Sequence, residues 1–128
     1  MRHKNSMQTP LARVRGLGSA KSGLHHWWHQ RLTALAMVPL MLASLALVAT
    51  MGSLDYQGAM ALMANPFAAA LLLLLVVVGF YHAALGLQVV IEDYVSAEGT
   101  RLALILIVKM CLFALAIVTL LSFLKVAI

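Results

Sequence analysis

A run without Asp, Glu, Lys or Arg extends over residues 67–91 and reads FAAALLLLLVVVGFYHAALGLQVVI. The hydrocarbon core of a bilayer is about 30 Å thick and needs about 20 helical residues, so this run is long enough to cross once. Asn65-Pro66 precedes it. Proline is favoured at the first position of a helix, and the residue before it avoids the helical region. We therefore predict a membrane-spanning helix that begins near Pro66 and ends near Val95.

Two further stretches have the length of a membrane span. Residues 32–54 contain no charged residue, and residues 102–124 contain only Lys109. The intervening residues 52–64 are interpreted as an external connection that includes a short interfacial helix. The fold class that we predict is an all-α integral membrane protein with three transmembrane helices. The predicted spans are 31–52, 66–95 and 101–125.

The composition supports this fold class. Of the 128 residues, 63% are hydrophobic and 10% are charged, and the mean hydropathy is +0.97. In ordinary soluble domains about 45–50% of the residues are hydrophobic and about 25% are charged. This composition excludes a soluble domain and a disordered tail. The expected partner is membrane lipid, and nucleic acid is not an expected partner. A single cysteine, Cys111, excludes an internal disulfide, a cysteine-based zinc site and an iron–sulfur cluster held by this chain alone. The scarcity of acidic residues argues against a self-sufficient hydrolase or nucleotide enzyme.

The positive charges predict the orientation. Five of the nine Lys and Arg residues precede residue 31, whereas the connection at 52–64 has none and carries Asp55. The positive-inside rule then places the N-terminus in the cytoplasm and the C-terminus in the periplasm, with the loop 92–101 on the cytoplasmic side. The basic region is too long for a signal peptide and lacks a small-residue cleavage motif. We therefore divide the chain into a basic cytoplasmic or interfacial segment and an anchor domain, at residues 1–30 and 31–128.

His82 lies inside the apolar run. An ionisable residue at membrane depth is costly and normally faces the bundle interior, so it marks a functional site; a neutral histidine bonded across helices is the alternative. At about 100° per residue, Gly79, Gly86 and Asp93 share its helix face. Glycines one turn on either side of a histidine leave room for a flat group such as haem beside an axial imidazole, although they also serve plain helix packing.

Residues 25–31 read HHWWHQR. His25 and His29 have the spacing of a metal pair, but no Glu or Cys completes a site. The two tryptophans suit the interfacial aromatic belt, so an anchoring segment is the preferred interpretation. Arg31 either extends its charge to the membrane surface or binds an anionic partner such as a carboxylate.

Two carboxylates stand where the span at 66–95 ends. Glu92 and Asp93 lie at the C-terminal end of the predicted helix, where the macrodipole favours a cation. Their negative charges therefore destabilise this end of the helix, and folding gives no reason for them. Alternatively, they mark the water interface, with Tyr94 in the aromatic belt. Lys109 lies about 12 Å into the third span, where snorkelling is the preferred interpretation.

These motifs resemble a known family. His82, followed by Gly86 and by Asp93-Tyr94 at positions four, eleven and twelve, resembles the second-helix signature of the hydrophobic membrane anchors of bacterial succinate dehydrogenase, respiratory complex II. The segment from Ser22 through Arg31 and Thr33 is similar to the family's approach to its first helix, and Arg101 matches the start of its third. The resemblance covers about residues 16–125, and the third helix contributes only generic features.

The resemblance implies a haem site. His82 would be an axial ligand of haem b, and a partner cytochrome b anchor subunit would supply the second histidine. Gly86 would contact the haem. His25 and Arg31 would lie near the haem propionates or the quinone entrance.

The resemblance also implies a quinone site and partners. Tyr94 would donate a hydrogen bond to ubiquinone, and Asp93 would support that site. The chain would not be an enzyme by itself: a flavoprotein subunit would oxidise succinate, and an iron–sulfur subunit would deliver electrons to this anchor and on to the quinone pool of the respiratory chain. The expected location is the bacterial inner membrane, as a multi-pass subunit of a heterotetramer whose further oligomerisation stays open.

A function of another class competes with this one. In a small transporter or proton-relay subunit, His82, Lys109 and Asp93 would pass protons across the membrane. Transporters usually contain internal repeats and broken helices at the midplane, and neither is visible in this sequence. We therefore prefer the electron-transfer anchor.

Overall fold

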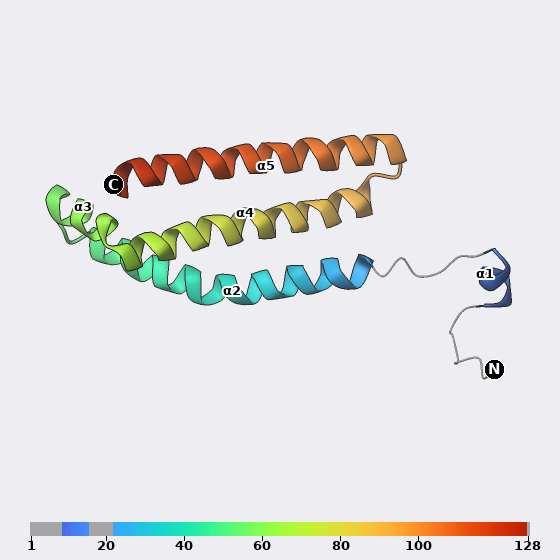
Figure 1. The fold of residues 1–128 in the computed structure, drawn as a ribbon, viewed down its shortest axis with the longest axis horizontal. Helices are drawn as coiled ribbons and strands as arrows, with labels where there is room; N and C mark the ends of the chain where they lie inside the picture. The colour runs from blue at the N-terminus through green and yellow to red at the C-terminus, as the bar shows by residue number, and fades with distance from the viewer. Residues whose placement is uncertain (1–8, 16–21, 128) are drawn as a thin grey trace.

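The computed structural model describes residues 9–15 and 22–127, and every regular element within them is a helix (Figure 1). The prediction of an all-α fold is thus confirmed. Three of the helices are long and apolar enough to cross a membrane, over Gly23–Met51, Pro66–Tyr94 and Glu98–Val126. The helices are α1 (Pro10–Val14), α2 (Ser22–Met51), α3 (Tyr56–Ala64), α4 (Pro66–Tyr94) and α5 (Glu98–Ala127).

The three long helices form a single layer with α4 in the middle. Helix α4 packs against both α2 and α5, whereas no Cα atom of α2 lies within 8 Å of one of α5. The start of α2 and the α4–α5 connection lie at one end of the layer, and α3 and the C-terminal end of α5 lie at the other (Figure 1). A side chain on α4 can therefore meet α2 on one side and α5 on the other.

The beginning of α4 is where the sequence predicts it. The Asn65 side chain accepts hydrogen bonds from the backbone N–H groups of Phe67 at 2.9 Å and Ala68 at 3.4 Å, and Pro66 occupies the first helical position. This is the usual N-cap arrangement. Asp55 caps α3 in the same way, through the N–H of Gly58 at 2.9 Å. The predicted short helix within the connection at 52–64 is confirmed.

Helix α2 begins at Ser22 rather than near residue 31. The edge of the apolar run marks where the lipid-covered part of the helix begins. It does not mark where the helix itself begins. Residues 24–30 contain neither proline nor glycine, so the backbone hydrogen-bond ladder continues through them. The polar segment HHWWHQR is consequently the first part of α2, with no break between residues 30 and 31.

Very little of the described chain is buried within the layer. Only Ala68 and Leu85 form a hydrophobic core, with Ser44 as the buried polar residue, and large apolar side chains are exposed along every long helix. Exposed apolar surface on this scale marks a membrane or protein contact. Lipid or other proteins are therefore needed to cover its helices.

Candidate cofactor site

A groove lies between the first turns of α2 and the last turns of α4. Its volume is about 510 Å³. It extends along α4 from His82 to Glu92, a rise of about 15 Å, and so leads from inside the span to the end of the helix. Its lining residues are Gly23, His26, Trp27, Gln30, Arg31 and Ala34 of α2, with His82, Val89 and Glu92 of α4.

His82 is half-buried against α2, and both of its ring nitrogens have contacts there. Its Nδ1 is 2.9 Å from the Thr33 hydroxyl oxygen, and its Nε2 is 3.5 Å from the side-chain amide nitrogen of Gln30. The same hydroxyl lies 2.7 Å from the backbone oxygen of His29. Helix α2 thus determines how the imidazole of α4 is oriented at the inner end of the groove.

Two polar atoms in the groove lining have no hydrogen-bond partner in the described part of the chain. They are Nε2 of His26 and Oε1 of Gln30, and both are buried. An unsatisfied buried polar atom costs about 1–3 kcal/mol, and both of these atoms belong to residues that line the groove. Arg31 adds a cation to the same lining, with its guanidinium 5.5 Å from the centre of the Trp27 ring.

The predicted glycine face has a more local role. A Cβ atom on Gly86 would lie 3.4 Å from the side-chain nitrogen of Gln30, whereas one on Gly79 would meet nothing within 4 Å. Gly86 therefore lets Gln30 approach His82, and it is not itself part of the groove lining. Gly79 lines a separate apolar cavity of about 310 Å³. The contact between Gly86 and haem stays a prediction.

The residues predicted for the quinone lie next to the groove. Tyr94 is the last residue of α4 and is 86% exposed, and Asp93 is also exposed. Neither side chain has a hydrogen-bond partner within residues 9–15 and 22–127. Their neighbour Glu92 does line the groove, and it accepts a hydrogen bond of 2.7 Å from the Gln88 amide. The side chains of the two residues predicted for the quinone are thus exposed in this chain, and their role stays a prediction.

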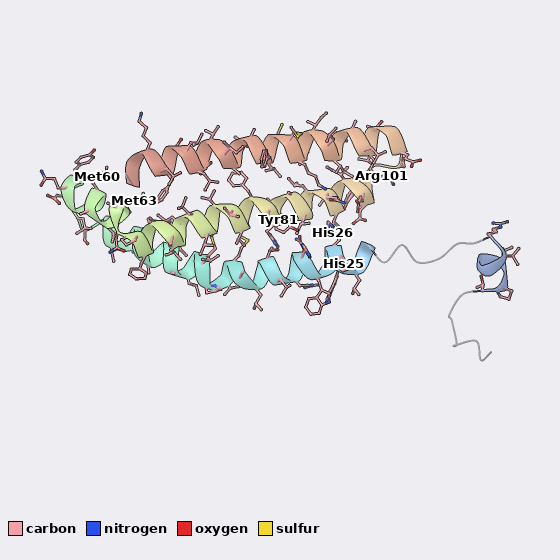
Figure 2. The ribbon with its side chains drawn as sticks, in the orientation of Figure 1. His25, His26, Met60, Met63, Tyr81 and Arg101 are labelled. Atoms are coloured by element: carbon pink, nitrogen blue, oxygen red, sulfur yellow. The ribbon has the colours of Figure 1, made fainter. Side chains whose placement is uncertain are left out.

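The first turns of α2 distinguish two neighbouring histidines (Figure 2). His26 lines the groove, whereas His25 is exposed and does not. The sequence did not single out His26, Gln30 and Thr33 as candidate site residues. Their spacing of four and three residues places them on one helix face, a signal that becomes visible once α2 is extended back to Ser22. The role of His25 stays a prediction.

A second polar contact between α2 and α4 involves His29 and Tyr81, which directly precede Gln30 and His82 in the sequence. His29 Nδ1 and the Tyr81 hydroxyl lie 2.5 Å apart. Tyr81 also lines a cavity of about 320 Å³ between α4 and α5, together with Lys109. Lys109 and His82 thus line different cavities and Asp93 lines neither, an arrangement that does not support the proton-relay alternative. In the described ranges, no group of three His, Cys, Asp or Glu residues could hold a metal ion.

Comparisons with known proteins agree with this architecture. Residues 5–119 match the model of the family described as succinate dehydrogenase/fumarate reductase transmembrane subunit. Curated relatives named succinate dehydrogenase hydrophobic membrane anchor subunit occur in Rickettsia bellii, at 39% identity over 78% of this chain and 80% of the relative, and in Rickettsia conorii, at 37% over 88% and 87%. A protein of the same name from Paracoccus denitrificans is 35% identical over 77% of this chain and 75% of its own. No solved structure matches significantly.

The match to the family model covers the first two apolar helices completely and the third up to residue 119, and the relatives are similar over most of their own length. The chain therefore belongs to the family of succinate dehydrogenase and fumarate reductase transmembrane subunits.

Proposed function

We propose that this chain is the membrane-anchor subunit of a succinate:quinone oxidoreductase, in which it helps to bind haem b and forms part of the ubiquinone-reduction site. The observation that carries the proposal is the groove with His82 at its inner end and Arg31 and His26 along its outer part. The names of the relatives support the anchor role.

The residues of the groove fit a haem. His82 would supply an axial nitrogen, and Arg31 and His26 would supply donors to the anionic propionates. The buried, unpartnered Nε2 of His26 is the observation that favours such a donor role. Ala34 and Val89 provide apolar wall. When bound, haem b would store a single electron beside the quinone site.

The chain offers one histidine to the haem, so a partner cytochrome b subunit would supply the second ligand. The exposed apolar surface of the layer is available for that subunit. Iron–sulfur and flavoprotein subunits would complete a heterotetramer in the bacterial inner membrane, and succinate would be oxidised on the flavoprotein. The anchor by itself would not be an enzyme.

Tyr94 and Asp93 would contribute to quinone binding at the end of α4. A quinone is a flat apolar ring with two carbonyl oxygens that need donors once water is excluded. A phenol combines an O–H donor with an apolar body, and the adjacent carboxylate can orient that hydroxyl or an ordered water. Because Tyr94 is exposed, the remaining walls of this pocket would come from partner subunits.

The direct test is purification of the complex that contains this chain. We expect a flavoprotein, an iron–sulfur protein and a second membrane subunit to co-purify, and the reduced-minus-oxidised absorption spectrum to contain b-type haem bands. Purification of the chain without large soluble partners and without haem bands would contradict the proposal.

The proposed orientation places the start of α2 and the α4–α5 connection in the cytoplasm. These two regions lie at the same end of the layer (Figure 1), and the basic N-terminal residues favour the cytoplasm for that end. A topology reporter fused after Gly99 is expected on the cytoplasmic face, and one fused after Ser53 on the periplasmic face. A Gly99 fusion that reports from the outer face would overturn the orientation.

Arg31 is expected to bind an anionic group in the groove. Arg31→Ala should lower haem retention severalfold, and Arg31→Lys should restore it only in part, because lysine keeps the charge but loses the planar guanidinium fork. The measurement is haem content per complex after detergent washing. Arg101→Ala is the matched control, because Arg101 lies on α5 and does not line the groove. If both Arg31 variants retain haem like the wild type, Arg31 only anchors α2 at the membrane surface.

A further inference from the structure

We propose that Thr33 is a positioning residue for the haem site: its hydroxyl keeps the imidazole proton of His82 on Nδ1 and leaves the Nε2 lone pair free to bind iron. The inference rests on the proposed haem role of His82. It adds a residue of α2 that decides which nitrogen of the histidine on α4 is the ligand.

The Thr33 hydroxyl has a single hydrogen to donate. Its oxygen is 2.7 Å from the backbone oxygen of His29 and 3.1 Å from that of Gln30. Carbonyl oxygens only accept hydrogen bonds, so the hydroxyl donates to this pair, and the shorter contact is the four-residue back-bond typical of helical threonine. Toward His82, the Thr33 oxygen can then only accept. At 2.9 Å, it is a good acceptor for an N–H group on Nδ1.

The contact at the opposite nitrogen of the ring is consistent with the same tautomer. Nε2 of His82 lies 3.5 Å from the amide nitrogen of Gln30. An amide NH₂ group only donates, so it faces a nitrogen that carries a lone pair. Neutral imidazole has one donor and one acceptor nitrogen. The contacts of Thr33 and Gln30 therefore agree on a single tautomer, with the proton on Nδ1 and the lone pair on Nε2.

Of the two contacts of the His82 ring, the one with the Gln30 amide is the weaker and the easier to displace. Its contact with Nε2 is long, and its own Oε1 is buried without a partner in the described chain. A ligand at Nε2 would therefore displace a weak contact. Thr33, in contrast, is fixed by its own helix backbone. A second partner that holds the far nitrogen of a ligating histidine sets its tautomer and increases its basicity.

The experiment compares three variants of the intact complex. Thr33→Val removes the hydroxyl with little change in volume, and Thr33→Ser keeps it. Thr119→Val is the matched control, because Thr119 makes the same four-residue back-bond, to Leu115 at 2.8 Å, on the exposed surface of α5. The readouts are haem retention, the electron paramagnetic resonance spectrum of the oxidised haem, its midpoint potential, and the ¹⁵N resonances of His82 in haem-depleted complex, assigned by comparison with His82→Ala.

Thr33→Val should weaken haem retention about tenfold or more, the usual cost of losing an outer-shell partner of a metal ligand. It should also raise the midpoint potential, because an imidazole without an acceptor at Nδ1 is the poorer electron donor. Thr33→Ser and Thr119→Val should match the wild type. In wild-type complex depleted of haem, the ¹⁵N signals should show a protonated Nδ1 and a bare Nε2, and Thr33→Val should lose this preference.

A Thr33→Val complex with wild-type retention, potential and resonance spectrum would overturn the role of Thr33. So would ¹⁵N signals that place the proton on Nε2 in the wild type. Failure of the proposed function looks different: the wild-type complex would contain no b-type haem or would keep it in His82→Ala, while the ¹⁵N measurement still decides the tautomer.

Discussion

His82→Ala is expected to abolish the low-spin b-type haem spectrum of the complex while the subunit still inserts into the membrane. Alanine costs less to insert than histidine, so α4 should still form. The imidazole of His82 is the group at the inner end of the groove that can bind iron, and a methyl side chain cannot replace it. The measurement is the reduced-minus-oxidised spectrum of the purified complex, normalised to the amount of this subunit.

His29→Ala is the control that separates ligand loss from loosened helices. His29 forms the neighbouring polar contact between α2 and α4, with the Tyr81 hydroxyl, and it is not part of the groove lining. We expect this variant to keep its haem. An unchanged spectrum in His82→Ala would mean that the ligand lies elsewhere, and equal loss in both variants would mean that His82 acts only through helix packing.

Tyr94→Phe is expected to slow quinone reduction by about fivefold or more, because a buried quinone oxygen without its donor costs about 1–3 kcal/mol. The substitution removes one hydroxyl, and Tyr94 is exposed in this chain and makes no internal hydrogen bond in the described residues. Folding and haem content should therefore survive. Succinate oxidation with a soluble artificial acceptor should also persist, since that reaction does not need the quinone pocket.

Tyr56→Phe is the matched control for this variant. Tyr56 is similarly exposed, at 79% against 86% for Tyr94, but it lies on α3 at the opposite end of the layer. Its loss of a hydroxyl should leave quinone reduction unchanged. If Tyr94→Phe reduces quinone and binds site inhibitors as well as the wild type, Tyr94 belongs to the aromatic belt and partner subunits form the pocket.

The apolar helices and most of their ends can be predicted from the sequence alone. Each span follows from a run of about 20 or more uncharged residues, which only a helix can place in lipid with its backbone satisfied. Asn65-Pro66 marks the start of α4, because capping depends on residues only a few positions apart. His82 stood out for the same local reason, as an ionisable side chain inside an apolar run.

The surroundings of His82, in contrast, follow only from how the helices pack together. The contacts of its ring come from Thr33 and Gln30, and the separation of about 50 residues along the chain gives no local signal of that proximity. The packing of α4 between α2 and α5 likewise depends on the surfaces of all three helices together. It places His26 in the groove and leaves its neighbour His25 outside, because adjacent residues on a helix point about 100° apart. A histidine-rich segment is recognisable in the sequence. Which of its side chains reach the groove depends on how α2 is rotated about its axis relative to α4.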